Sequence, residues 1–230
     1  MLHACYKATL LQRAGALLAL VLLVFVLMPT QGGSENSVST EALPQTLEEG
    51  KHFERIGNPP EPTGASHLPE ILEIFNFKCP HCLTLYPHFA SWAAKQRGKF
   101  LFKTIPVYWG TQTDGPVRAY YAGHYLGKGE EMKEAIFSAH FGGGLNIENR
   151  NEMAFVAEEV GIRHDDFLSA YDSFGVERKA KQARRLAKDL GVRSTPQVVI
   201  DRTYRVTLTH ADGDPQRMMR IIETLIKTRP

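Results

Sequence analysis

The stretch Phe75–Phe89, FNFKCPHCLTLYPHF, places two cysteines two residues apart, directly behind an apolar run. Cysteines with this spacing form a redox centre, one half of a metal site or a structural crosslink. Each of these sites makes a different demand on the rest of the chain. The function of the pair is therefore decided by the composition and the motifs around it.

Length and charge set the first bounds. The chain has 230 residues, enough for one sizeable core or for a small domain with an insertion. Its formal net charge is only +2, and no module of interleaved basic and aromatic residues is present. The sequence therefore does not indicate nucleic-acid binding.

The N-terminus has the pattern of an export signal. Lys7 and Arg13 precede Ala14–Met28, an apolar run without charge. This run is shorter than the roughly 18–20 apolar residues of a spanning helix, so we interpret residues 1–32 as a signal peptide. An uncleaved N-terminal anchor is the alternative. Both interpretations place residues 33–230 outside the cytoplasm.

If residues 33–230 are exported, the cysteines have to be counted in that part alone. Cys5 precedes the apolar run, so the exported part contains only Cys79 and Cys82. A disulfide-stapled scaffold needs more cysteines, and a crosslink over so short a loop stabilises little. A structural zinc site needs two further ligands, but the histidines are scattered at His88, His124, His140, His164 and His210. We therefore expect no metal and interpret the dithiol itself as the functional centre.

The cysteines are predicted to lie where a strand meets a helix. Leu68–Phe77 is typical of a buried strand, and Pro80 is suited to the first position of a helix. Apolar residues then recur at helical spacing, and Lys99–Tyr108 predicts a second strand. This arrangement places Cys79 at the N-terminus of the helix.

The position of Cys79 predicts that the two cysteines have different roles. Unpaired N–H groups and the helix dipole favour a thiolate at this end, and His81 is expected to add to that stabilisation. Cys82, one turn further along, is expected to be more buried and less ionised. We therefore interpret Cys79 as the attacking sulfur and Cys82 as the resolving one.

A second motif lies far along the chain, in GVRSTPQVVID. Thr195 and Pro196 precede a β-branched strand at Gln197–Asp201. A lone proline here is commonly a strand starter. Paired with an upstream C-x-x-C strand–helix unit, it also fits the cis-proline loop that faces the dithiol in thioredoxin-like folds. We therefore expect a cis Thr195–Pro196 bond.

The middle of the chain is predicted to be helical. Five segments with helical apolar spacing lie between glycine-containing breaks: Gly115–Gly127, Glu130–Phe141, Ile147–Val160, His164–Phe174 and Val176–Leu190. Within the last, Glu177–Lys188 is strongly basic. This basic stretch is interpreted as a solvated helix face, with a docking surface for a partner or anionic lipid as the alternative.

These elements predict an α/β protein with a thioredoxin fold and an inserted all-helical domain. The thioredoxin-like domain is expected at 51–112 and 191–230, after a linker at 33–50. The helical insertion is expected at 113–190.

Over residues 48–228 the chain resembles DsbA-type thiol:disulfide oxidoreductases. EEGKHFERI is similar to the first strand of that family, ILEIFNFKCPHC to its strand and active-site tetrapeptide, and GVRSTPQVVID to its cis-proline loop. The resemblance implies that Cys79 and Cys82 are redox-active. It also implies that His81 tunes them, that Pro80 belongs to the catalytic tetrapeptide, and that Thr195 and Pro196 line the substrate groove.

The resemblance also suggests a buried acid. Glu73 corresponds to the acid found beneath the dithiol, where it assists proton transfer. Taken alone it is a strand residue that can be exposed, but its apolar neighbours favour burial. Lys103 is a candidate charge partner for Glu73. The chain departs from the family at Thr195, where valine is frequent, and the hydroxyl there is expected to weaken oxidising power or alter partner choice.

The resemblance implies a thiol–disulfide oxidase that donates the Cys79–Cys82 disulfide to newly exported, unfolded proteins in the periplasm. A membrane, quinone-linked reoxidase of the DsbB type is the implied partner, and no soluble cofactor is expected. Two alternatives stay open. The same dithiol can serve a reductase or isomerase, and a non-catalytic, chaperone-like protein can bind exported chains without turnover.

Overall fold

The computed structural model describes residues 46–61 and 67–228. The predicted signal peptide at 1–32 and all but the last five residues of the predicted linker at 33–50 lie outside these ranges. Within them, no helix is both long enough and apolar enough to cross a membrane.

The described residues form a five-stranded mixed sheet in the order β1-β5-β4-β2-β3. β2 pairs in parallel with β3 and antiparallel with β4, and β5 pairs antiparallel with both β4 and β1. The strands are β1 (Glu54–Arg55), β2 (Glu70–Phe75), β3 (Leu101–Pro106), β4 (Gln197–Ile200) and β5 (Tyr204–Thr207).

Seven α-helices accompany the sheet within the described part of the chain. In chain order they are α1 (Pro80–Lys95), α2 (Gly115–Tyr125), α3 (Gly129–Phe141), α4 (Arg150–Glu159), α5 (His164–Tyr171), α6 (Phe174–Asp189) and α7 (Pro215–Thr228). A 3-10 helix, η1 (Thr209–Ala211), precedes α7.

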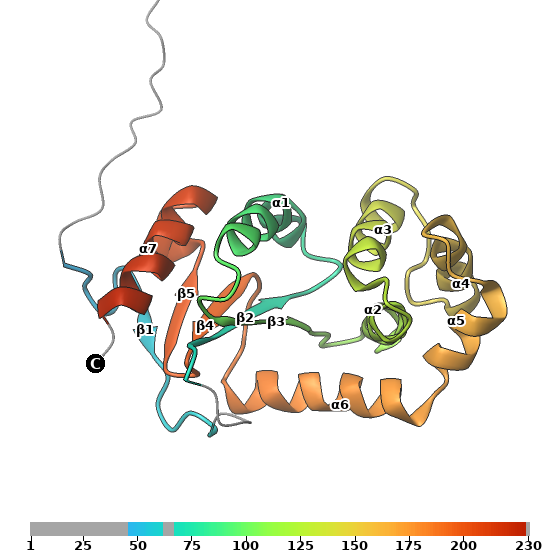
Figure 1. Ribbon diagram of the computed structural model, residues 1–230, viewed down its shortest axis with the longest axis horizontal. Coiled ribbons are helices and arrows are strands. Elements are labelled where there is room, and N and C mark those ends of the chain that lie inside the picture. The colour runs from blue at the N-terminus through green and yellow to red at the C-terminus, as the bar shows by residue number, and fades with distance from the viewer. Residues whose placement is uncertain (1–45, 62–66, 229–230) are drawn as a thin grey trace, which may run out of the picture. The chain divides into compact units, whose positions relative to one another are not determined.

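β2 lies inside the sheet and is buried along its whole length, which explains its nearly continuous apolar sequence. Ile71 packs in one core cluster with residues of α1 and α7, whereas Leu72 and Ile74 pack in another with residues of α6. Figure 1 shows α1 and α7 on one face of the sheet and α6 on the other. The strand that leads to the cysteines is therefore covered on both faces.

The helices α2 to α5 lie between β3 and β4 in the chain and share one core cluster. That cluster also contains Phe75, Phe77 and Cys82, so the insertion packs directly against the end of β2 and the start of α1. The α2–α3 crossing requires Gly123, where an added Cβ would lie 2.6 Å from the Cβ of Met132. The predicted α/β fold with a helical insertion is confirmed, while the exact domain boundaries stay a prediction.

The basic segment lies on α6, which runs back from the insertion to the sheet (Figure 1). The helix buries Val176, Ala180, Ala183 and Ala187 along one stripe, and most of its lysines and arginines are exposed. This alternation is that of an amphipathic surface helix. It agrees with the interpretation of Glu177–Lys188 as a solvated face.

Candidate active site

Cys79 lies at the junction of β2 and α1, as the N-cap residue of the helix. Its backbone is extended, with φ −96° and ψ 114°, and Pro80 begins the helix. The N–H of Cys79 donates to the carbonyl of Asn76 at 3.1 Å, and the carbonyl of Cys79 accepts from the N–H of Cys82 at 3.0 Å. These bonds fix the turn and leave the first N–H groups of α1 directed at the Cys79 sulfur.

The two cysteines are free thiols in very different surroundings. Cys79 is half-buried, whereas Cys82 is only 2% exposed. This is the difference in burial that the sequence predicted.

The pKa values of the two thiols move in opposite directions. A hydrogen bond from the Cys82 thiol lowers the pKa of Cys79 to about 5, against the opposing effect of burial. The Thr195 side chain and the backbone N–H groups of Cys82 and His81 lower it further. Burial, followed by the neighbouring Cys79 sulfur, raises the pKa of Cys82. At neutral pH the pair therefore consists of a thiolate at Cys79 and a thiol at Cys82.

The loop before β4 approaches the dithiol from the far part of the chain. The Thr195–Pro196 bond is cis, as predicted, and the carbonyl oxygen of Thr195 lies 3.3 Å from the Cys79 sulfur. The carbonyl accepts a hydrogen bond from the thiol form, while the Thr195 side chain stabilises the thiolate. By stabilising the thiolate, the hydroxyl favours the reduced protein and should therefore increase its oxidising power. The sequence analysis expected this hydroxyl to weaken the oxidising power.

Pro80 and His81 are both exposed at the start of α1. His81 contributes its backbone N–H to the stabilisation of the Cys79 thiolate. The contribution of its imidazole stays a prediction.

Glu73 is buried on β2, with 3% of its surface exposed, and Lys133 of α3 donates to its carboxylate at 2.7 Å. Lys133 is itself only 2% exposed. Its Nζ lies 4.4 Å from the ring centroid of Phe75 and 4.5 Å from that of Tyr86. The acid is thus neutralised by a cation that the helical insertion supplies.

The prediction that Lys103 pairs with Glu73 was wrong. Lys103 lies opposite Leu72 in the parallel β2–β3 pairing, and side chains alternate between the two faces of a sheet. Its ammonium group therefore reaches Glu70, at 2.5 Å, on the other face from Glu73. Glu70 also accepts a hydrogen bond from Arg202 at 2.7 Å.

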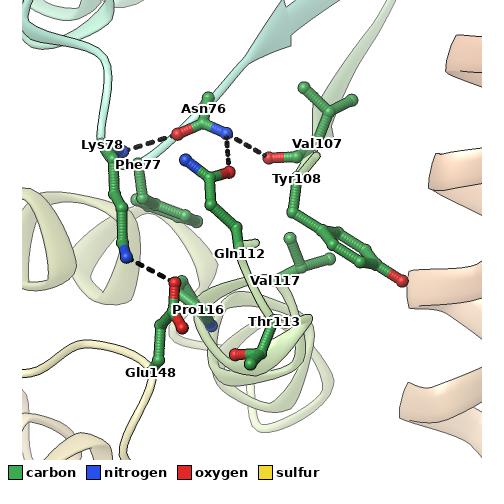
Figure 2. Close-up of a pocket in the computed structure, with 10 residues that line it drawn as sticks. All are labelled: Asn76, Phe77, Lys78, Val107, Tyr108, Gln112, Thr113, Pro116, Val117 and Glu148. Atoms are coloured by element: carbon green, nitrogen blue, oxygen red, sulfur yellow. Dashed lines mark hydrogen bonds and ion pairs between the residues drawn. The ribbon is translucent and has the colours of Figure 1, made fainter. Parts of the chain in front are cut away.

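The sequence analysis missed Asn76, which organises the turn before Cys79 (Figure 2). Its side-chain nitrogen donates to the Val107 carbonyl at 2.9 Å and to Gln112 at 2.7 Å, and its side-chain oxygen accepts from the Lys78 N–H at 2.7 Å. An asparagine directly after a strand commonly makes such a turn, and this was the available signal.

Lys78, next to Cys79 in the chain, forms an ion pair with Glu148 of the insertion (Figure 2). The cavity between these residues and Asn76 measures only about 10 Å³. It has room for about one water molecule and is too small for a substrate. The residues in Figure 2 therefore form a structural joint between the active-site turn and the insertion.

Among the residues that the structure describes, no group of three or more histidines, cysteines and carboxylates is placed to hold a metal ion. The chemistry that the site supports is thiol–disulfide exchange between Cys79, Cys82 and an external thiol.

Comparison with known proteins agrees with this chemistry. Residues 88–219, more than half of the chain, match the model of the DSBA-like thioredoxin domain family. The thiol:disulfide interchange protein DsbA of Pseudomonas syringae pv. tomato is 29% identical over 182 residues, covering 79% of this chain and 84% of that protein. The Burkholderia cepacia protein of the same name is 28% identical over 188 residues, covering 81% and 88%.

Solved structures show the same fold. The structure of the oxidoreductase DsbA from Xylella fastidiosa superposes with a TM-score of 0.71 at 27% identity, covering 79% of this chain and 96% of that one. Pseudomonas aeruginosa DsbA gives a TM-score of 0.70 at 25% identity, covering 77% and 92%.

Proposed function

The chain belongs to the DSBA-like thioredoxin domain family and is a thiol:disulfide oxidoreductase, and from this premise we propose that it is an oxidase of newly exported, unfolded proteins. The observation that carries the proposal is the position of Cys79 as the N-cap of α1, where the Cys82 thiol, Thr195 and the first backbone N–H groups lower its pKa to about 5. A stabilised thiolate favours the reduced form of the enzyme. Its disulfide is therefore readily given away.

The reaction conserves electrons and atoms. A substrate thiolate attacks the Cys79 sulfur, the Cys79–Cys82 bond breaks, and Cys82 leaves and takes up a proton. A second substrate thiolate then attacks the substrate sulfur of the mixed disulfide, and Cys79 leaves as a thiolate. The substrate loses two electrons and gains a disulfide, while the enzyme becomes a dithiol.

The buried state of Cys82 requires a route for its proton. Glu73, held as the partner of Lys133 under α1, is the proposed group that assists this transfer. Pro80 and the His81 imidazole are proposed to tune the Cys79 thiolate from the helix start. Thr195 and Pro196 are proposed to contact the substrate, which is supported by the 3.3 Å approach of the Thr195 carbonyl to the Cys79 sulfur.

The enzyme must regain its disulfide after each turnover. Relatives named thiol:disulfide interchange protein DsbA support a membrane, quinone-linked reoxidase of the DsbB type and a periplasmic location, with residues 1–32 as the export signal or anchor. These two assignments are part of the proposal.

A redox titration tests the direction of the reaction. The purified protein is equilibrated with glutathione buffers, and the dithiol fraction is measured by thiol alkylation. An oxidase should have a potential above about −180 mV, whereas a value near −270 mV is that of a reductase and would contradict the proposal. The oxidised protein should also introduce disulfides into a reduced, unfolded substrate, and Cys79→Ala/Cys82→Ala should not. Equal cellular function of that double variant would favour the chaperone-like alternative.

A further inference from the structure

A second, larger cavity lies on the α6 side of the sheet and shares the loop that approaches Cys79. Its volume is about 660 Å³, in the range of small-molecule and peptide pockets. Its wall is formed by β1, β4 and β5, by η1, and by the C-terminal end of α6 with the loop that follows. Ser194 and Gln197, which flank the Thr195–Pro196 pair, belong to this wall.

The cavity wall carries more positive than negative charge. Its charged members are four cations and two carboxylates: Arg55, Lys188, Arg193 and Arg205, with Glu54 and Asp189. Arg205 is partly satisfied by Glu54 at 3.4 Å. Lys188 and Arg193 are exposed and have no ion pair with any residue that the structure describes. Within the described residues these two cations are therefore beyond ion-pair distance of a carboxylate, although Asp189 adjoins Lys188 in the chain, and the wall as a whole is positively charged.

Two side chains of the cavity wall carry buried polar atoms that lack a partner in the described part of the chain. Gln197 is only 3% exposed, and its amide nitrogen donates to the Ser194 hydroxyl at 3.1 Å. Its amide oxygen has no hydrogen-bond partner among the residues that the structure describes, and neither has the Nε of Arg205. Both side chains project to the α6 face, because Gln197 lies two residues from Val199 on β4, on the same face, and Arg205 is paired with Val199. An acceptor and a donor are thus left unsatisfied, at a cost in free energy.

We propose that this cavity binds an acidic segment of polypeptide. Side-chain carboxylates of the segment would be attracted by Lys188 and Arg193, and its backbone would hydrogen-bond to Gln197 and Arg205 in the wall. A membrane of anionic lipid is a poorer fit, because the wall also contains the carboxylates Glu54 and Asp189.

The proposal deepens the proposed function and, for its use in catalysis, rests on it. Ser194 adjoins Thr195, whose carbonyl is 3.3 Å from the Cys79 sulfur. A substrate with acidic residues close to its cysteine would therefore contact the cavity and the dithiol together. The two contacts favour oxidation of cysteines in acidic sequence.

Binding is tested without thiol chemistry. A cysteine-free pentapeptide with three glutamates is titrated into the protein by calorimetry, beside the same peptide with glutamines. Lys188→Gln/Arg193→Gln should weaken binding of the glutamate peptide roughly threefold to tenfold. Lys95→Gln/Arg97→Gln, which removes two exposed charges from the end of α1, should leave the affinity unchanged. All four positions are exposed, and circular dichroism checks the fold of each variant.

Three outcomes would overturn the proposal. In the first, the glutamate and glutamine peptides bind with equal affinity. In the second, Lys188→Gln/Arg193→Gln and Lys95→Gln/Arg97→Gln lose the same affinity for the glutamate peptide, which would indicate general charge attraction. Alternatively, vesicles of phosphatidylglycerol and phosphatidylcholine bind in a manner that requires Lys188 and Arg193, whereas the glutamate peptide does not bind. That result would assign the surface to lipid.

Turnover separates this proposal from the proposed function. A peptide with a reduced cysteine pair and a glutamate tail should be oxidised with a higher kcat/KM than one with a glutamine tail. The ratio should fall toward one in Lys188→Gln/Arg193→Gln, and equal values in the unaltered protein would contradict the cavity's role in catalysis. An absence of oxidation with both tails would contradict the oxidase alone, because the calorimetric result decides the cavity independently.

Discussion

The pKa of Cys79 is lowered by atoms that come from two distant parts of the chain. The helix start provides the N–H groups of His81 and Cys82, and the loop before β4 provides Thr195. The two parts meet because β2 and β4 are paired neighbours in the sheet. A substitution at one of these residues should therefore change the pKa of Cys79.

Thr195→Val removes the hydroxyl while keeping a β-branched side chain of similar volume. We expect the pKa of Cys79 to rise from about 5, since one hydrogen bond to the thiolate is lost. The ultraviolet absorbance of the thiolate, recorded against pH, measures the shift. Thr195→Ser retains a hydroxyl and is the matched control, expected to stay close to the unaltered protein. If Val and Ser behave alike, the hydroxyl does not stabilise the thiolate.

Cys82→Ala removes the resolving thiol and leaves Cys79 able to attack. Mixed disulfides between the variant and exported proteins should accumulate and disappear when a reductant is added, because no internal thiol releases the partner. Non-reducing gels of cell extracts detect them. Cys79→Ala is the counterpart and should trap few partners. The reverse pattern would exchange the assigned roles of the two cysteines.

At the scale of elements, local patterns in the sequence predicted a large part of the fold. The apolar run of β2, the proline at the start of α1 and the helical spacing of α2 to α6 are local signals, and these elements are present in the structure. The two cysteines and the Thr195–Pro196 loop followed from the same patterns together with the family resemblance. They lie together as expected.

The contacts that were missed depend on tertiary arrangement. Lys133 lies 60 residues from Glu73 in the chain, and only the packing of α3 against the end of β2 brings them together. Lys103, the candidate partner, is on the neighbouring strand, but the register turns it to the opposite face. Strand register and helix placement are set by the whole core, so single-residue patterns do not determine such pairs.

The pair between Glu73 and Lys133 is buried, so breaking it should destabilise the protein. Lys133→Met leaves a buried carboxylate without its counter-charge, and we expect a loss of about 3–5 kcal/mol in the free energy of unfolding. Urea unfolding measures it. The double variant Glu73→Leu/Lys133→Met removes both charges and should recover most of the loss. Lys181→Met, on the exposed face of α6, should hardly change stability. A small loss in Lys133→Met would show that solvent or another cation reaches Glu73.

At the scale of the whole molecule, the helical insertion and the thioredoxin-like part meet around the dithiol. The insertion supplies Lys133 beneath β2 and Glu148 beside Lys78, and its core contains Cys82. The ionisation of Cys79 is therefore part of the folding equilibrium of the chain. Its effect on stability depends on pH in a direction that the pKa values fix.

The reduced and oxidised proteins should accordingly change their relative stability with pH. A disulfide across four residues stabilises the fold by about 2 kcal/mol in the loop-entropy model. In the dithiol form, a folded pKa of about 5 lies below the unfolded value of about 8.5. At pH 7 this contributes at most about 2.7 kcal/mol, and less than about 2 kcal/mol once the solvent screening of the half-buried sulfur is included. The two contributions should therefore nearly offset each other at neutral pH.

The sign follows from the lowered pKa of Cys79. Its contribution is fully present above the unfolded pKa and is lost as the pH falls through about 5, so the oxidised form should be the more stable one below pH 5. Between pH 5 and pH 8 the stability of the reduced form, relative to that of the oxidised form, should rise steadily. Above about pH 8.5 the gain should stop, because Cys79 is then ionised in both the folded and the unfolded state. It should then reverse, because Cys82 stays a thiol in the fold but ionises when unfolded. Urea unfolding of both forms at pH 4, 5, 7 and 8 measures these differences.

Cys79→Ala is the control, since it should lose the rise in stability with pH. An oxidised form that exceeds the reduced one by the same margin at pH 5 and pH 8 would show that the Cys79 thiolate is not coupled to folding, and would favour a reductase.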